Sequence, residues 1–429
     1  MQTQGPILKN NVPSIGDEVT LPQKIKEEQT IQELLKDAEL PFDFSIEQVP
    51  DAELLANPKH IFLTGVTGFV GSHLLEELLL QHPQATIHCL IRAEGLIDAW
   101  RRIDSTFKKF KLAFKREYGR RVIPYEGDLS LPNFGMEAYE YEQLLHTIDV
   151  IYHSGSLVNY VQPYQLIKKT NIDGLHHILH LAVNGKVKHL VLLSSMGVFS
   201  WGRPFTGKTW MYENDSIEQN LPAVSRDLAY IKSKWVMESI AEKAKNKGLP
   251  IINFRLGFAV CHSTSGATVR NQWWGALIRS CAELGSFPLV MGLKDELTTV
   301  DYMCKAIAHI SKKKEAIGQN FHLSPLPEND VSLTDFCAKI NEYFGLDLKG
   351  MEYHEWLNQW RHDTDLPIYP LLSLFTEDIH EGKSLVEAYE NTYYYDRSNT
   401  QRFLADINLK PPAFTKEVMA PYLQFIEVL

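Results

Sequence analysis

Residues 60–79 read HIFLTGVTGFVGSHLLEELL, and this stretch predicts the fold of the chain. Its first five residues form an apolar run typical of a buried strand, and the residues after the third glycine have helical spacing. The three glycines between strand and helix have G-x-x-G-x-x-G spacing. Such glycines permit a tight turn, a close approach of the backbone to a pyrophosphate, and close packing of helix on sheet. The dinucleotide contacts that we predict in this loop are Gly65, Thr67, Gly68, Phe69, Val70 and Gly71.

Strand-like and helical segments alternate on the C-terminal side of this loop. The runs TIHCLIR, RVIPYEGD, DVIYHSG, HLVLLSS and PIINFRLG are separated by helical stretches. This alternation predicts an α/β fold, a Rossmann-like doubly wound parallel sheet with a smaller, mostly helical C-terminal lobe. The predicted regions are a lead segment with a short helix (1–57), a dinucleotide-binding domain (58–260, with further strands near 297–325) and a substrate-binding lobe (261–429).

The bulk composition is that of a soluble globular protein. The chain has 429 residues, of which 44% are hydrophobic and 22% charged, and its net charge is −10. This charge argues against nucleic-acid binding through bulk electrostatics. No apolar run reaches the roughly 18 residues of a membrane span, and no secretory signal is visible, so we expect a cytoplasmic protein. The five cysteines lack metal-binding spacing and predict free, buried thiols, and no metal site is expected.

The end of the second predicted strand indicates which dinucleotide would bind. An NAD site usually has an acidic residue there, whereas this strand ends at Arg92. A guanidinium matches the geometry of a 2′-phosphate, so we predict NADP, with Arg101 or Arg102 as a second contact. Asp128 and Leu129, at the end of the third strand, are expected beside the adenine.

A tyrosine and a lysine four residues apart, Tyr230 and Lys234, would share one face of a later helix. The preceding strand ends at Ser195, and the C-terminal ends of parallel strands line the ligand crevice of a doubly wound sheet. Ser195 would hold the substrate oxygen and Tyr230 would donate a proton to it. Lys234 would lower the pKa of Tyr230 through its charge and would also hold the ribose hydroxyls of the cofactor.

The combination of TGxxGxxG, a serine at a strand end and Y-x-x-x-K resembles the extended short-chain dehydrogenase/reductases. The strings GDLSLPNFGM, VNYVQPY and YIKSKWVMES are similar to one branch, the thioester reductase domains of nonribosomal peptide and polyketide synthesis and of carboxylic acid reductases. The resemblance covers about residues 36–345. Leu256 departs from the proline that is usual there, and CHSTSG replaces a glycine-containing loop entry.

The resemblance implies an activity and a partner. Such enzymes use NADPH to reduce an acyl thioester on the phosphopantetheine arm of an acyl or peptidyl carrier protein. They release a free thiol and an aldehyde, which some reduce further to the alcohol. By this resemblance, Ser195 and Tyr230 would stabilise the oxyanion, and the further cofactor contacts would be Ser154, Gly155 and Leu256.

Several alternatives stay open. Sugar-nucleotide epimerases and dehydratases share the fold and the triad, although Arg92 and VNYVQPY argue against them. A non-catalytic dinucleotide-sensing module is a second rival.

The basic run 108–121 is either a solvated helix face or a docking surface for an acidic carrier protein. The segments LLSLF (371–375) and TYYYD (392–396) are candidates for lining an acyl tunnel, and neither the acyl group nor the oligomeric state can be predicted. The tryptophans expected in the core of the second lobe are Trp273, Trp274, Trp356 and Trp360.

Overall fold

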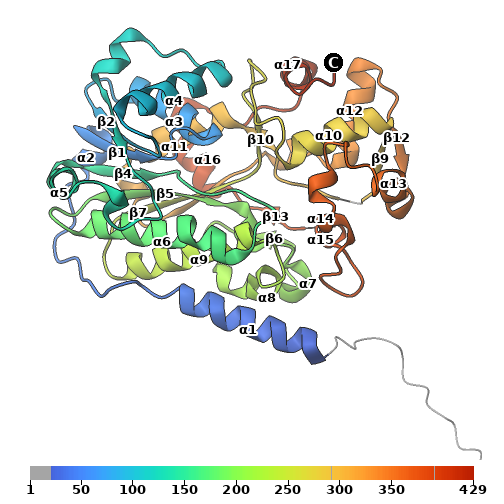
Figure 1. Cartoon of the computed structure of the whole chain (residues 1–429), viewed down its shortest axis with the longest axis horizontal. Helices are drawn as coiled ribbons and strands as arrows, with labels where there is room; N and C mark the ends of the chain where they lie inside the picture. Colours follow the sequence, from blue (N-terminus) through green and yellow to red (C-terminus); the bar gives the residue numbers. More distant parts are fainter. Residues whose placement is uncertain (1–20, 291, 391) are drawn as a thin grey trace, which may run out of the picture.

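Seven parallel strands form the central sheet of the computed structural model, which describes residues 21–290, 292–390 and 392–429 (Figure 1). Their order is β11-β7-β5-β4-β1-β2-β3. The predicted Rossmann-like sheet is therefore confirmed. The strands are β1 (His60–Thr64), β2 (Thr86–Ile91), β3 (Val122–Glu126), β4 (Val150–His153), β5 (His189–Ser195), β7 (Ile251–Leu256) and β11 (Asn320–Leu323).

Alternate residues of the strands pack into two separate cores. In β1, Ile61 and Leu63 belong to one buried apolar cluster, and Phe62 belongs to the other. This is the period of two that a strand imposes on its side chains. Helices cover both faces of the sheet (Figure 1). One face carries α3 (Phe69–Gln81), α4 (Leu96–Lys109), α11 (Val300–Ile310) and α16 (Ser398–Leu404), and the other carries α5 (Ala138–Thr147), α6 (Tyr164–Val183) and α9 (Ala229–Asn246).

The strand order reverses at β1. This strand pairs with β2 on one side and with β4 on the other, while β4 pairs in turn with β5. In doubly wound sheets, ligands bind in the crevice beyond the carboxyl ends of the strands at this reversal. The segments that begin at Gly65 and Ser154 follow β1 and β4 directly, so both start at this edge of the sheet.

A third apolar cluster forms the core of the second lobe, which is mostly helical as predicted. All four tryptophans expected there are buried in it. In Figure 1 the lobe lies to the right of the central sheet, where α10, α12, α13 and α14 are labelled. Its helices are α10 (Trp273–Leu284), α12 (Leu333–Phe344), α13 (Tyr353–Trp360), α14 (Ser373–Thr376), α15 (Leu385–Ala388) and α17 (Lys416–Phe425). Its strands form short pairs, β8 (Ala259–Cys261) with β10 (Thr298–Thr299) and β9 (Ser286–Pro288) with β12 (Lys349–Met351).

The basic run 108–121 is not one continuous helix face, contrary to one of the two expectations. Helix α4 ends at Lys109, and Lys111 then adopts a left-handed conformation with φ of 56°. A β-carbon disfavours that conformation inside a helix, so the chain turns there. The run continues as a separate turn of 3₁₀ helix, Arg116–Arg120. Its basic side chains therefore lie on two elements and a loop.

The N-terminal helix α1 (Leu21–Asp37) packs against the face covered by α6 and α9. Asp37 accepts a hydrogen bond from Tyr164 over 3.0 Å and pairs with Lys168 over 2.5 Å. No helix in the described parts of the chain combines the length and apolarity of a bilayer span. The prediction about a secretory signal concerns residues 1–20, which lie outside the described residues. The division into three regions and the cytoplasmic location stay predictions.

All five cysteines are buried and unpaired, as the sequence predicts.

Candidate active site

The glycine loop leaves no room for a side chain at Gly65 or at Gly71. Gly65 has a φ of +79°, and a β-carbon on it would lie 2.8 Å from the backbone nitrogen of Gly155. A β-carbon on Gly71 would lie 2.1 Å from the carbonyl oxygen of Gly65. Helix α3 begins directly after Gly68. The first turn of this helix therefore presents free N–H groups and the positive end of its dipole at the sheet edge.

A single cavity of about 780 Å³ runs from this loop towards the second lobe. All of the predicted site residues line it, although they come from elements far apart in the sequence. They are Gly65, Thr67, Gly68, Phe69, Val70, Gly71, Arg92, Arg102, Asp128, Leu129, Ser154, Gly155, Ser195, Tyr230, Lys234 and Leu256. The structure thus brings together what the sequence analysis selected separately, while the role of each residue stays a prediction.

Buried polar contacts hold the segment after β4 against the glycine loop. The Thr64 hydroxyl accepts a hydrogen bond of 2.9 Å from the backbone N–H of Gly155, and it also contacts Nδ1 of His153 over 2.9 Å. A β-carbon on Gly155 would lie 2.6 Å from Leu129. These contacts leave the backbone itself as the wall of the cavity, which suits the close approach of a pyrophosphate.

Two arginines line the cavity near this loop, Arg92 directly after β2 and Arg102 on α4. Arg92 is exposed, and Nη1 of Arg102 donates a hydrogen bond to the carbonyl oxygen of Arg92. Arg101, the alternative second contact, does not line the cavity and pairs instead with Asp98. This end of the cavity therefore offers two guanidinium groups beside the glycine loop. Together, the backbone walls and the arginines fit a dinucleotide, whose phosphates are anionic.

Two of the acidic residues near this end, Glu126 and Asp128, are bonded to the protein itself. The Glu126 carboxylate accepts a hydrogen bond of 3.0 Å from the backbone N–H of Gly95. The Asp128 carboxylate accepts bonds of 2.8 Å and 2.7 Å from the N–H and hydroxyl of Ser130. Both carboxylates thus stabilise the loops that follow β2 and β3.

Ser195, Tyr230 and Lys234 meet at the middle of the cavity. The Ser195 hydroxyl lies at the end of β5 and is hydrogen-bonded to Tyr230, which lies in the first turn of α9. The Lys234 ammonium donates a hydrogen bond of 2.9 Å to the carbonyl oxygen of Leu193 and lies 5.9 Å from the centre of the Tyr230 ring. One of its three protons is thus used by the protein, and Lys234 also lines the cavity.

Burial decides the pKa values of this group, and one expectation was wrong. Lys234 was expected to lower the pKa of Tyr230, but burial raises the pKa of Tyr230 to about 12, against the opposing effect of its hydrogen bond with Ser195. Tyr230 is therefore protonated at neutral pH, which is the state that a proton donor requires. Burial lowers the pKa of Lys234 to about 8, and the negative charge of Glu238 opposes this shift.

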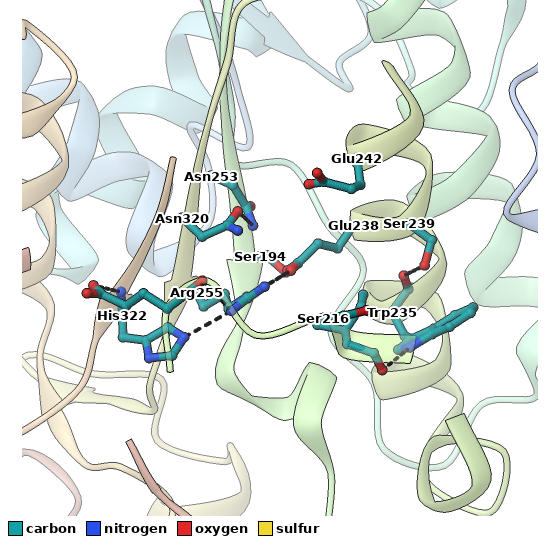
Figure 2. Close-up of polar contacts among 12 residues, drawn as sticks. Ser194, Ser216, Trp235, Glu238, Ser239, Glu242, Asn253, Arg255, Asn320 and His322 are labelled. Atoms are coloured by element: carbon teal, nitrogen blue, oxygen red, sulfur yellow. Dashed lines mark hydrogen bonds and ion pairs between the residues drawn. The ribbon is translucent and has the colours of Figure 1, made fainter. Parts of the chain in front are cut away.

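A buried ion pair between Glu238 and Arg255 links the elements that carry this group (Figure 2). Glu238, on α9, accepts hydrogen bonds of 2.8 Å and 2.5 Å from Arg255 on β7, and one of 2.7 Å from Ser194 on β5. Arg255 also contacts Nε2 of His322 on β11 over 3.0 Å. Burial alone would raise the pKa of Glu238, but the charge and hydrogen bonds of Arg255 outweigh it and hold that pKa below its ordinary value. This network was not foreseen, because its members lie on four separate elements.

A second unforeseen contact holds α9 to the segment after β4. Asn171, buried on α6, donates hydrogen bonds of 2.8 Å to the Ser233 hydroxyl and 3.2 Å to the carbonyl oxygen of Leu157. Its own side-chain oxygen accepts one of 2.7 Å from the N–H of Leu157. Ser233 precedes Lys234, so Asn171 positions the lysine turn relative to the cofactor side of the cavity.

The far end of the cavity is lined by the second lobe. Leu374, from LLSLF, lines it, whereas no residue of TYYYD does. Trp273 belongs to the core of the lobe, as expected, and also lines the cavity. Asp295 and Glu296 lie at this end as well. No periodic or spacing signal marks these two acids in the sequence, whereas Tyr160, which also lines the cavity, belongs to the VNYVQPY string.

Three comparisons with known proteins agree with this geometry. A family model described as "Male sterility protein", an NAD-binding domain family, matches residues 63–307. An aldehyde reductase of Aspergillus flavus, lnaA, is 32% identical over 86% of this chain and 36% of its own length. Nonribosomal peptide synthetase asaC of the same fungus is 32% identical over 87% of this chain and 37% of its own length. The chain thus spans little more than a third of these relatives.

The solved structure of the terminal R domain from the myxalamid PKS-NRPS biosynthetic pathway superposes with a TM-score of 0.82 and 28% identity. The match covers 92% of this chain and 97% of that one. The resemblance to the thioester reductase branch is therefore confirmed.

Proposed function

The chain belongs to the male sterility protein family, and from this premise we propose that it is an NADPH-dependent thioester reductase. Its substrate is an acyl group on the phosphopantetheine arm of a carrier protein, and its products are an aldehyde and the free thiol. The observation that carries the proposal is the meeting of Ser195, Tyr230 and Lys234 in the cavity that the glycine loop and Arg92 also line. Similarity to reductases and to an R domain supports it.

When bound, the dinucleotide supplies a hydride to the acyl carbon, and this chain's residues manage the oxygen. Ser195 and Tyr230 donate hydrogen bonds to the carbonyl oxygen as negative charge develops on it. Tyr230 then passes its proton to that oxygen, which gives a hemithioacetal. The hemithioacetal collapses to the aldehyde and releases the thiol, so one thioester, one hydride and one proton are consumed. Lys234 holds the ribose hydroxyls. Its positive charge stabilises the negative charge that remains on Tyr230 when the proton leaves.

Arg92 and Arg102 support the choice of NADPH. Both lie at the end of the cavity beyond the glycine loop, where a 2′-phosphate of the adenine ribose would lie. Guanidinium groups bind phosphate with two parallel hydrogen bonds, and an NADH ribose offers no such charge.

The test is a coupled assay that also decides between the rival functions. Oxidation of NADPH and NADH is followed with a panel of acyl-pantetheine thioesters and, separately, nucleotide sugars, and products are identified by mass spectrometry. NADPH oxidation with thioesters and formation of aldehyde or alcohol are the expected results. Conversion of a nucleotide sugar would favour the epimerase alternative, and dinucleotide binding without any turnover would favour the sensing module.

A further inference from the structure

The lysine and the arginines that line the cavity lie away from its lobe end, and Asp128 is the acid that lines the cavity beside the two arginines. Arg92 and Arg102 lie at the dinucleotide end, and Lys234 lies in the middle. At the lobe end, Asp295 and Glu296 are the charged residues, and no lysine or arginine accompanies them among the described residues that line the cavity. A ligand that fills the cavity therefore meets cations at its phosphate end and carboxylates at its acyl end.

Backbone hydrogen bonds hold the main chain of the two acidic residues in place. The N–H of Phe258, just beyond β7, donates to the carbonyl oxygens of both Asp295 and Glu296, over 3.1 Å and 3.2 Å. Glu296 adopts a left-handed conformation with φ of 47°, and its carbonyl oxygen lies 2.3 Å from where a β-carbon on Gly257 would be. Such a conformation is unfavourable for glutamate and persists only where the surroundings enforce it. The turn is thus rigidly built against the end of a central strand.

Neither carboxylate has the partners that a structural role would require. Oδ2 of Asp295 accepts a hydrogen bond of 2.7 Å from Nε1 of Trp273, and its Oδ1 accepts none within the described parts of the chain. The Glu296 side chain is only 9% exposed, and its Oε1 has no hydrogen-bond partner among the described residues. The neighbouring cation, Lys294, instead pairs over 2.8 Å with Asp330, which does not line the cavity. Buried carboxylates without partners are costly unless a ligand compensates them.

Aromatic rings surround the same end. Tyr160, Trp273 and Tyr389 line the cavity together with the two acids. The Tyr160 ring lies 6.4 Å from that of Tyr230, centre to centre, so this end adjoins the proposed proton donor. Faces of tryptophan and tyrosine attract cations, and carboxylates add direct charge compensation. Acids combined with aromatic rings in a confined space are suited to an ammonium group and not to an anionic or purely aliphatic one.

We propose that the lobe end of the cavity, formed by Asp295, Glu296 and Trp273, binds a positively charged amine on the acyl group of the substrate. This proposal rests on the proposed function, because it assigns the acyl group of the thioester. Asp295 hydrogen-bonds the ammonium through its free oxygen, Glu296 offers its unpartnered Oε1 as an acceptor, and the aromatic rings cover the adjoining carbon atoms. The substrate class is therefore aminoacyl thioesters, and amine-free fatty or aromatic acyl groups are poor substrates.

The ionisation of Asp295 is consistent with this site. Burial raises the pKa of Asp295 to about 6, the hydrogen bond from Trp273 opposes this, and the charge of Asp330 adds to it. The carboxylate is therefore mostly ionised at neutral pH, and a bound ammonium would stabilise it further.

The test compares pantetheine thioesters that differ only by an amine. Phenylalanyl is paired with 3-phenylpropanoyl, and 6-aminohexanoyl with heptanoyl, so the two pairs place the amine near to and far from the thioester. We expect kcat/KM to be about 10- to 100-fold higher for the amine in at least one pair, the equivalent of one charge-assisted hydrogen bond. Asp295→Asn should remove most of that preference and Glu296→Gln part of it. Glu328→Gln, which alters an exposed acid outside the cavity, should retain it.

Calorimetry keeps the site testable if no thioester is reduced. Hexylammonium should bind the enzyme–NADP complex more tightly than hexan-1-ol does, and Asp295→Asn should abolish the difference in a variant that still unfolds cooperatively. If Asp295→Asn does not fold, Glu296→Gln serves in its place. Failure of every thioester would overturn the reductase function. Reduction of both members of each pair at equal rates, or equal binding of the two calorimetric probes, would overturn the amine site.

Discussion

The Ser194 hydroxyl donates a hydrogen bond of 2.7 Å to the carboxylate of Glu238 and thereby joins the end of β5 to helix α9. Ser194 precedes Ser195, and Glu238 lies one helical turn after Lys234. One buried contact therefore sets the relative position of the serine and of the tyrosine–lysine pair. Arg255 completes the arrangement from the next strand, β7 (Figure 2).

Removing the charge of Glu238 should destabilise the fold. Arg255 would remain in a site where its side chain is only 2% exposed, without a counter-charge. Loss of one partner of a buried pair costs about 3–5 kcal/mol, so Glu238→Gln should lower the free energy of unfolding in urea by about that amount. Replacing both residues, Glu238→Gln with Arg255→Met, should cost less than the single change. The control is Glu242→Gln, one turn further on, whose carboxylate is 57% exposed and whose loss should cost about 0–1 kcal/mol. Equal losses for Glu238→Gln and Glu242→Gln would contradict this reading.

The same substitution should alter the pH profile of turnover. Burial lowers the pKa of Lys234 to about 8, and Glu238 opposes that shift. Lys234 is charged below this pKa and neutral above it, so kcat/KM should fall as pH rises through about 8. Without the Glu238 charge the pKa of Lys234 drops further, so the alkaline fall in Glu238→Gln should begin at lower pH. An alkaline limb at unchanged or higher pH would show that Glu238 does not support the charge on Lys234.

Tyr230→Phe should retain cofactor binding and lose turnover. The ring that lines the cavity remains, and only the proton donor is removed, so kcat should fall about 100-fold or more. Fluorescence titration with NADPH measures binding, and NADPH oxidation with a thioester measures turnover. Tyr139→Phe, at a residue that is 72% exposed, is the control and should behave like the native enzyme. A near-native rate for Tyr230→Phe would remove the tyrosine from the mechanism.

Arg92→Ala should weaken NADPH and leave NADH nearly unchanged. The lost contacts are charge-assisted hydrogen bonds to the 2′-phosphate, so the Kd for NADPH should rise about 10- to 100-fold. The matched control is Arg101→Ala, because Arg101 pairs with Asp98 and does not line the cavity. Equal affinity of the native enzyme for NADPH and NADH would contradict the assignment of Arg92.

Local sequence signals predicted the sheet, the glycine loop and the triad. The loop follows from three glycines at fixed spacing, and Tyr230 and Lys234 follow from their separation on one helix. The ends of parallel strands meet at one edge, so Ser195 could be placed beside them without coordinates.

Contacts that arise from tertiary packing could not be predicted from local sequence signals. Glu238 and Arg255 pair across a helix and a strand, and Asp295 and Glu296 line the cavity only because their turn packs on Gly257 and Phe258. Nothing in the local sequence distinguishes these acids from solvated ones. The pKa of Tyr230 was misjudged for a similar reason, since it follows from the burial of the side chain, which the local sequence does not show.

The measurement that tests the central claim most directly is NADPH oxidation with three forms of one acyl group: the free acid, its pantetheine thioester and its carrier-bound thioester. A carboxylate anion repels hydride and hydroxide leaves poorly, whereas a thioester carbonyl is electrophilic and its thiolate leaves readily. We predict no oxidation with the free acid with or without ATP, measurable oxidation with the pantetheine thioester, and the highest kcat/KM with the carrier-bound form, since docking raises its local concentration. Oxidation of NADPH with the free acid, or equal rates for all three forms, would contradict the proposed function.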